Sequence, residues 1–219
     1  MSVAATEPRW RRLPRERPRQ ILEAALQVFG EQGFRSTRLE DVAQRAGVSK
    51  GTIYLYFNSK DELFTEMVRH ALGRIIAGEI EGDAPESAVE ELTMRLRSFW
   101  AYLRSPEFET LYRLIQGELH HFPDLTRSYA RSVVDRVTSL LGDAVRRGIG
   151  SGEFRDQDVA AAARIMLALL VKHAVWCARP EQWPGLGPQD ADRVFEQVLE
   201  FTLASLRPER LPSGEAPNG

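Results

Sequence analysis

The run from Lys50 to Tyr56 combines a cation, a hydroxyl group and two phenols with a glycine that carries no side chain. As a helix, this run offers only Ile53, with Phe57 just after it, to a core, so its polar face needs a partner outside the chain. Glycine permits close backbone approach, lysine and threonine reach base edges or phosphates, and tyrosine hydroxyls donate to phosphate oxygens. These residue types predict contact with the major groove of DNA. The alternative is that both tyrosines are surface residues without a ligand.

A sharp turn from Ala46 to Ser49 precedes this run and would position it. Gly47 can supply the positive φ of the turn, and Val48 can point back into a small core. Leu39, Val42 and Ala43 recur at helical spacing before the turn. Two short helices joined in this way predict a helix-turn-helix, in which the second helix enters the groove.

Three helix starts surround the predicted groove-binding helix. Thr37 with Glu40 and Ser59 with Glu62 have the spacing of capping boxes, and Ser49 can cap the helix from Lys50 to Phe57. Free amide groups at helix starts also bind phosphate, so these residues are expected to be phosphate contacts, simple caps, or both. Arg38 and Lys60 stand beside two of these starts. Arg38 is either a solvent-exposed charge or a phosphate contact.

The charge of the chain is uneven, although the formal net charge is only -2. Residues 1–60 contain 11 Lys and Arg against 6 Asp and Glu, whereas the remainder contains 18 against 25. A basic N-terminal segment on an acidic body is expected when one end of a protein meets a phosphate backbone. The cluster from Arg9 to Arg19 predicts a flexible basic arm that adds minor-groove or phosphate contacts, or a merely solvated tail.

The rest of the chain predicts an all-α protein, because apolar residues recur at spacings of three and four after residue 20. The first helix is expected to end at Gly33, one long helix to run from Leu125 to about Arg147, and another to run from Asp158 to Trp176. The expected organisation is a basic arm at 1–14, a helix-turn-helix domain at 15–62, a larger helical bundle for effector binding and dimerisation at 63–207, and a disordered tail at 208–219.

The N-terminal motifs resemble the TetR family of bacterial transcriptional regulators over about residues 18–68. The similarity lies in Gly33-Phe34, Ser36-Thr37, Asp41-Val42-Ala43, Ala46 to Phe57 and Ser59 to Leu63, and Gly152 to Arg155 resembles the C-terminal half of many members. The resemblance implies a homodimeric repressor that a small-molecule effector releases from a palindromic operator in double-stranded DNA. The expected DNA contacts are Thr37, Arg38, Ser49, Lys50, Gly51, Thr52, Tyr54, Leu55, Tyr56 and Lys60.

Aromatic residues concentrate in the middle of the chain, where most of them are expected to be core. A cavity between bundle helices would also need apolar walls and a few polar groups, which predicts an apolar or aromatic effector. The candidate pocket consists of Phe99, Trp100, Leu103, Phe108, Tyr112, Gln116, His120, His173 and Trp176.

The last two predicted helices have more apolar surface than one neighbour each can cover. They predict a dimer face at Leu169, Val194, Val198 and Phe201, which would suit a two-fold symmetric operator. The alternative is that both helices lie inside one subunit.

The sequence lacks the residues that are characteristic of other classes of protein. It has no Gly-rich phosphate loop, His-Glu-x-x-His motif or nucleophile elbow, so neither an enzyme nor a cofactor is expected. Adjacent His120 and His121 point about 100° apart on a helix, which argues against a metal site. The single Cys177 and the short apolar stretch from Ile165 to Val171 predict a cytoplasmic protein without a membrane span. The remaining alternative is a helical effector-binding or metal-sensing protein without specific DNA binding.

Overall fold

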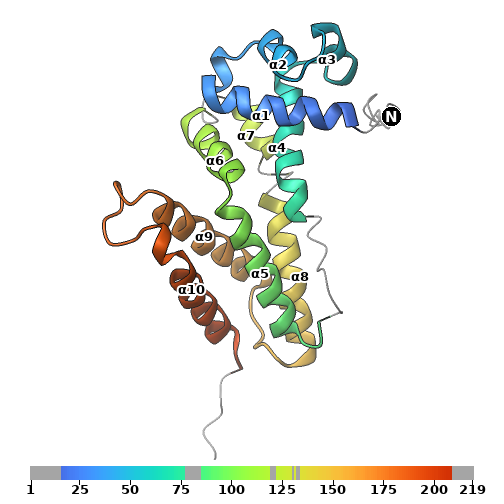
Figure 1. Cartoon of the computed structure of the whole chain (residues 1–219). Helices are drawn as coiled ribbons and strands as arrows, with labels where there is room; N and C mark the ends of the chain where they lie inside the picture. The colour runs from blue at the N-terminus through green and yellow to red at the C-terminus, as the bar shows by residue number, and fades with distance from the viewer. Residues whose placement is uncertain (1–15, 77–84, 119–121, 130, 132–133, 209–219) are drawn as a thin grey trace, which may run out of the picture. The chain divides into compact units, whose positions relative to one another are not determined.

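A computed structural model describes residues 16–76, 85–118, 122–129, 131 and 134–208, and these residues form helices without any strand (Figure 1). The all-α prediction is therefore confirmed. The elements are α1 (Glu16–Ser36), α2 (Leu39–Arg45), α3 (Lys50–Tyr56), α4 (Lys60–Ile76), α5 (Ala88–Leu103), α6 (Pro106–Glu118), α7 (Pro123–Tyr129), α8 (Asp135–Ser151), α9 (Val159–Ala178), a 3₁₀ turn (Pro188–Asp190) and α10 (Ala191–Leu206).

Packing divides the chain into two compact units that alternate along the sequence. The first unit takes its residues from Met1–Ala77 and Arg104–Arg136, and the second from Gly78–Leu103 and Val137–Gly219. The whole of α4, together with α6 and α7, therefore packs with the helix-turn-helix, whereas the sequence analysis placed a boundary after residue 62. Most of the expected basic arm and the expected tail lie outside the described residues.

The first unit is built on α1, which contacts α2, α4 and α6. Apolar residues that recur at helical spacing on this helix, including Ile21, Ala25 and Val28, are buried. Gly30 allows α6 to approach closely, since a Cβ atom at this position would lie 2.4 Å from Thr110 Cγ2. Four aromatic rings pack in a chain of contacts within this unit, namely Phe29, Phe34, Phe64 and Phe122.

The α1 helix is interrupted where the sequence predicted its end. Gly33 has φ 79° and ψ 164°, outside the helical region, and the last residues to Ser36 follow this kink. The cap predicted for α2 was displaced by one residue: Arg38, and not Thr37, is the N-cap, and its amide donates to Asp41 Oδ2 at 3.3 Å. The predicted turn at Gly47 is confirmed by a φ of 65°.

The second unit contains α5, α8, α9 and α10, in which α5 and α10 both contact α9. The segment predicted as one helix from Leu125 to about Arg147 contains two α-helices, α7 to Tyr129 and α8 from Asp135, and the described residues between them, 131 and 134, are π-helical. The α8 helix ends at Ser151, four residues after the predicted end near Arg147. Gly148 is required for packing, because an added Cβ atom would lie 2.1 Å from the Phe154 ring.

The α9 helix is apolar on most sides. It has the length and composition of a membrane span, with a mean hydropathy of 1.6, which the sequence analysis did not expect. Only 28% of that apolar window is buried within the chain. One helix of this kind is weak support for a membrane protein, since helices that pack in a core or an interface have the same composition.

Candidate functional site

The α3 helix presents its polar side chains on a defined frame. Ser49 is its N-cap, as predicted, and the Ser49 hydroxyl accepts a hydrogen bond from the Thr52 amide at 3.1 Å. Ile53 is fully buried on the inner face and anchors the helix against the first unit. A helix of seven residues has little stability alone, so this cap and anchor determine which face is exposed.

We call the exposed residues Lys50, Gly51, Tyr54 and Leu55 the α3 surface. Tyr54 is 49% exposed and Leu55 51% exposed, so two large neighbouring side chains lie in solvent on this helix. A Cβ atom on Gly51 would meet only Ser49 Oγ, at 3.7 Å, which is an ordinary contact. Internal packing therefore does not require a glycine at position 51, and its missing side chain leaves the backbone open to a ligand.

The cation of the α3 surface is paired with a carboxylate on α2. Lys50 Nζ forms an ion pair with Glu40 and lies 5.8 Å from the centre of the Tyr54 ring. The hydrogen bond between the two groups lowers the pKa of the Glu40 carboxyl and raises the pKa of the Lys50 ammonium. Both side chains are about half exposed, so phosphate could replace Glu40 as the partner of Lys50 at little cost.

Two predicted DNA contacts lie inside the subunit. Thr37 is 2% exposed, and its hydroxyl donates to Gly33 O at 2.7 Å. Tyr56 is 8% exposed and packs beside the Phe57 ring. The prediction that these side chains face a ligand was wrong, because Tyr56 turns toward the core with Ile53, three residues earlier on the same helix.

The start of α4 has the predicted cap but uses its lysine differently. Ser59 Oγ accepts from the Glu62 amide at 3.0 Å, and the Glu62 carboxylate accepts from the Asn58 amide at 2.8 Å. The ammonium of Lys60 donates to backbone carbonyls of the segment that precedes α2, the nearest being Phe34 O at 2.8 Å. The Lys60 ammonium is therefore occupied by backbone carbonyls, whereas the sequence predicted that it would contact DNA.

The structure adds an ion pair that the sequence patterns did not indicate. Arg45 at the end of α2 donates to both carboxylate oxygens of Glu31 on α1, at 2.7 and 2.9 Å. This pairing lowers the pKa of Glu31, through its hydrogen bond to the guanidinium. The partners are 14 residues apart, beyond the reach of any pairing rule within one helix, so only the tertiary structure reveals this contact between α2 and α1.

The predicted effector residues fall in both compact units. Phe99, Trp100 and Leu103 are buried on α5, and His173 and Trp176 are half-buried on α9, all within the second unit. On α6, in the first unit, Phe108 is buried and Tyr112 is half-buried, whereas Gln116 is exposed. His120 lies outside the described residues. The second unit thus holds five of the nine predicted residues.

Two indoles among these residues have a buried N–H group without a hydrogen-bond partner in the described part of the chain. These are Trp100 Nε1 and Trp176 Nε1. Trp100 is 4% exposed, and its ring centre lies 5.5 Å from that of Phe195. The ring centre of Trp176 lies 4.9 Å from that of His173. A buried donor without an acceptor costs about 1–3 kcal/mol. Because indole can only donate, an acceptor atom is the missing partner.

The predicted dimer face needs revision at two residues. Val194 and Val198 are buried within the subunit, at 3% and 7% exposure, because they lie on the inner face of α10. Phe201 is 63% exposed on the same helix, Ile165 is 58% exposed on α9, and Leu169 is half-buried. The apolar surface left in solvent by the described residues of α9 and α10 thus centres on Ile165 and Phe201.

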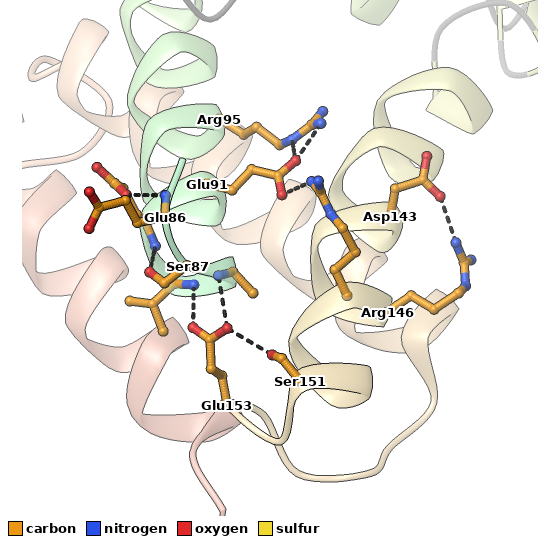
Figure 2. Close-up of polar contacts among 12 residues, drawn as sticks. Glu86, Ser87, Glu91, Arg95, Asp143, Arg146, Ser151 and Glu153 are labelled. Carbon is orange, nitrogen blue, oxygen red and sulfur yellow. Dashed lines mark hydrogen bonds and ion pairs between the residues drawn. The ribbon is translucent and has the colours of Figure 1, made fainter. Parts of the chain in front are cut away.

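The segment from Gly152 to Arg155 joins three helix ends in the second unit, and Figure 2 shows the contacts of its Glu153 with Ser151 and with the start of α5. The Glu153 carboxylate accepts from the Ala88 and Val89 amides at the start of α5, at 3.0 and 3.2 Å. These bonds, with a third from Ser151, lower the pKa of Glu153. Arg155 donates its amide to Leu206 O and its Nε to Ser205 O, at the end of α10.

A buried carboxylate on α5 lies near this segment. Glu91 is 2% exposed and forms ion pairs with Arg95, four residues later, and with Arg147 on α8 (Figure 2). A buried charge is tolerated only when it is paired and hydrogen-bonded. The two guanidinium groups supply this pairing and connect α5 to α8.

Two family models match the chain in adjacent regions. The model described as bacterial regulatory proteins, tetR family, matches residues 21–67, which include α2 and α3. The model described as the C-terminal domain of AefR-like transcriptional repressors matches residues 90–207, more than half of the chain. The second match covers α5 from its third residue and all the described helices that follow it.

Individual relatives agree with the family models. The fatty acid metabolism regulator protein of Bacillus subtilis is 28% identical over 200 residues, which cover 89% of this chain and 98% of the relative. The HTH-type transcriptional repressor NicS of Pseudomonas putida is 30% identical over 155 residues, which cover 68% of this chain and 71% of the relative. The crystal structure of Bacillus subtilis FadR in complex with stearoyl-CoA has a TM-score of 0.70 and 24% identity, covering 86% of this chain and 99% of that one.

Proposed function

Because the chain belongs to the TetR family of bacterial regulatory proteins, we propose that it acts as a homodimer on a palindromic operator and that a fatty acyl thioester releases it. Family membership makes it a ligand-responsive DNA-binding transcriptional repressor. The operator symmetry, the homodimer, the effector class, a cytoplasmic location and the absence of catalytic activity are our proposals.

The observation that carries the DNA-binding role is the α3 surface. Its lysine, open glycine, tyrosine and leucine are exposed on a short helix whose opposite face is anchored by buried Ile53. Side chains of this kind contact phosphates and base edges, and Leu55 can contact a thymine methyl group. The proposed DNA contacts are Arg38, Ser49, Lys50, Gly51, Thr52, Tyr54 and Leu55. The alternative of a helical module without DNA binding leaves this surface unexplained.

The homodimer is supported by the exposed apolar surface of α9 and α10. Most of the apolar window of α9 is not buried within the subunit, and Ile165 and Phe201 are more than half exposed. Exposed apolar surface around two adjacent helices is typical of an interface between subunits. A two-fold dimer would place two copies of α3 on a symmetric DNA site, with half-sites about one helical turn, or a multiple of it, apart.

The effector class is proposed from the relatives and from the unpaired indoles. The relatives include a fatty acid metabolism regulator protein and a structure solved with stearoyl-CoA. In this chain, the second unit contains the buried indole N–H groups of Trp100 and Trp176, neither of which has an acceptor among the described residues. A thioester or carboxylate oxygen on an acyl chain would supply such an acceptor, while the acyl chain would contact the aromatic residues. Phe99, Trp100, Leu103, His173 and Trp176 are the proposed contacts in this unit.

Operator binding tests the DNA-binding proposal directly. Fluorescence anisotropy with a DNA fragment from upstream of the gene, or with a sequence selected from random DNA, should show salt-dependent binding of a dimer. Tyr54→Ala should weaken this binding about tenfold or more, because it removes an exposed α3 contact. Trp183→Ala is the matched control, since Trp183 is 42% exposed but lies in the second unit. Equal effects of both variants would contradict a reading role for α3.

Release by ligand tests the effector class. Stearoyl-CoA should dissociate the complex of protein and operator at concentrations where free coenzyme A does not, because the acyl chain provides the apolar contact. Release by coenzyme A alone, or no release by acyl thioesters of any chain length, would contradict this effector class. Neither result would affect the conclusion from the Tyr54 variant.

A further inference from the structure

The segment between α1 and α2 leaves several backbone carbonyls without helical partners. After the kink at Gly33, the chain turns at Thr37 and enters α2 at Leu39. Gly33 O is satisfied by the amide and hydroxyl of Thr37, at 3.3 and 2.7 Å. The carbonyls of Phe34, Arg35 and Thr37 need other donors, as the last carbonyls of a helix generally do.

Lys60 supplies those donors from another helix. Its ammonium nitrogen lies 2.8 Å from Phe34 O, 3.1 Å from Thr37 O and 3.2 Å from Arg35 O. A lysine ammonium has three N–H groups, so these three contacts use its full donor capacity. The charge also lies 4.7 Å from the centre of the Phe34 ring, where the π electrons favour a cation.

The position of Lys60 in the sequence gives this contact a consequence for α3. Lys60 is the first residue of α4, and the whole α2–turn–α3 motif lies between it and Thr37. The ammonium thus joins the point where the chain enters the motif to the point where it leaves. The exit is further held by the Ser59 cap and by Glu62, which accepts from the Asn58 amide.

We propose that Lys60 is a positioning residue for DNA reading: it fixes the entry and exit of the helix-turn-helix and thereby the orientation of the α3 surface, and it does not bind phosphate itself. This inference rests on the proposed DNA binding. Loss of the ammonium should allow α2 and α3 to move relative to α1 and α4, which would lower operator affinity without removing a phosphate contact.

Two variants of Lys60 separate positioning from phosphate binding. Lys60→Met keeps most of the stem but has no charge, and should weaken operator binding about tenfold while the slope of log K against log salt stays unchanged. Lys60→Arg keeps the charge, but its planar guanidinium cannot direct donors at three converging carbonyls as an ammonium does, so it should bind operator no better than Lys60→Met. Arg38→Met is the control for a phosphate contact and should reduce the slope by about 0.9.

Hydrogen exchange separates positioning from a general loss of folding. Measured well below the unfolding midpoint, Lys60→Met should accelerate exchange of α2 and α3 amides and leave α8 amides in the second unit unchanged. Lys60→Met with a slope reduced by about 0.9, or Lys60→Arg with wild-type affinity, would overturn the proposal in favour of a phosphate contact. Unchanged affinity in Lys60→Met would overturn it as well. Absence of operator binding by the wild-type protein would instead reject the proposed function.

Discussion

The α3 surface and the exposed face of α9 and α10 both leave large side chains in solvent, but their chemistry differs. The α3 surface mixes apolar and polar groups, with a cation, a phenol and a glycine around Leu55. The other face centres on Ile165 and Phe201, which have no polar atoms in their side chains. A mixed surface suits a charged, hydrated partner such as DNA, whereas an apolar surface suits another protein surface of the same kind.

The two surfaces are also supported differently. The α3 helix has seven residues and depends on a cap, a buried anchor and the contacts that surround the motif. The α9 helix has 20 residues and is packed against α5 and α10. A short helix held at its ends can be reoriented by a change in its frame, whereas a long packed helix resists such a change. This difference places the adjustable element at the DNA surface.

The largest effect is expected on dimerisation, from a change in the exposed face of α9 and α10. Phe201→Glu should convert the dimer to monomers, because it places a charge where about 1.5–3 kcal/mol of apolar burial is expected in each of two subunits, or roughly a 10²- to 10⁴-fold weaker dimer. Sedimentation velocity over a range of protein concentrations measures the change. Glu200→Ala, at an exposed neighbouring position, is the control. If Phe201→Glu remains dimeric, the interface lies elsewhere.

The next largest effect is expected on operator binding, from a change in the α3 surface. Gly51→Ala should weaken operator binding about 10- to 100-fold, since a methyl group would stand where the backbone approaches DNA. The fold has room for this methyl group and a helix favours alanine, so the free energy of unfolding should not fall. Anisotropy and urea denaturation measure the two quantities. Wild-type affinity in this variant would show that the α3 backbone does not approach the DNA closely.

A third effect is confined to stability in the second unit. Gly148→Ala should lower the free energy of unfolding by about 1–3 kcal/mol, because the new methyl group overlaps the Phe154 ring. Gly150→Ala, two residues later on α8 and without a neighbour within 4 Å, should be neutral or raise stability by up to about 1 kcal/mol. Denaturant unfolding of both variants tests the pair. Similar destabilisation by both would mean that Phe154 does not occupy the space above Gly148.

The smallest effect is a pH dependence at the start of α5. The pKa of Glu153 is lowered in the folded chain, so its contribution is present above the ordinary value of 4.5 and is lost as the pH falls through the lowered pKa. Glu153→Gln should therefore melt below the wild type at pH 7, and the two melting temperatures should converge in acid. Calorimetry from pH 7 to pH 3 provides the measurement. A constant difference across this range would show that the carboxylate charge makes no contribution to the cap.

Local contacts were predictable from the sequence where a single residue type determines the geometry. Gly47 was assigned the positive φ of the turn and Ser49 the cap of α3, and the structure has both. The Thr37 cap was misplaced because Gly33 kinks α1 and draws the Thr37 hydroxyl back to its carbonyl. Cap rules compare only neighbouring residues, and they cannot anticipate a competing acceptor in a distorted turn.

The exposure of side chains was harder to predict than the positions of turns and caps. Tyr54 and Tyr56 looked alike as phenols on a polar helix, yet only Tyr54 is exposed, because Tyr56 shares the inner face of α3 with Ile53. Val194 and Phe201 were both placed on the dimer face, and the packing of α10 against α5 and α9 leaves Val194 buried and Phe201 exposed. Burial depends on the neighbours of each helix face, which hydrophobic spacing alone does not identify.

The sequence by itself determined the all-helical fold, the helix-turn-helix and the family, because periodicity, turn residues and caps are local properties that survive in a linear chain. The tertiary structure alone decided how the long-range polar contacts are made: Lys60 with the segment before α2, Arg45 with Glu31, and Glu153 with the start of α5. These partners lie between 14 and 65 residues apart. A lysine or glutamate has many possible partners in sequence, and only the packed backbone brings one set within hydrogen-bond distance.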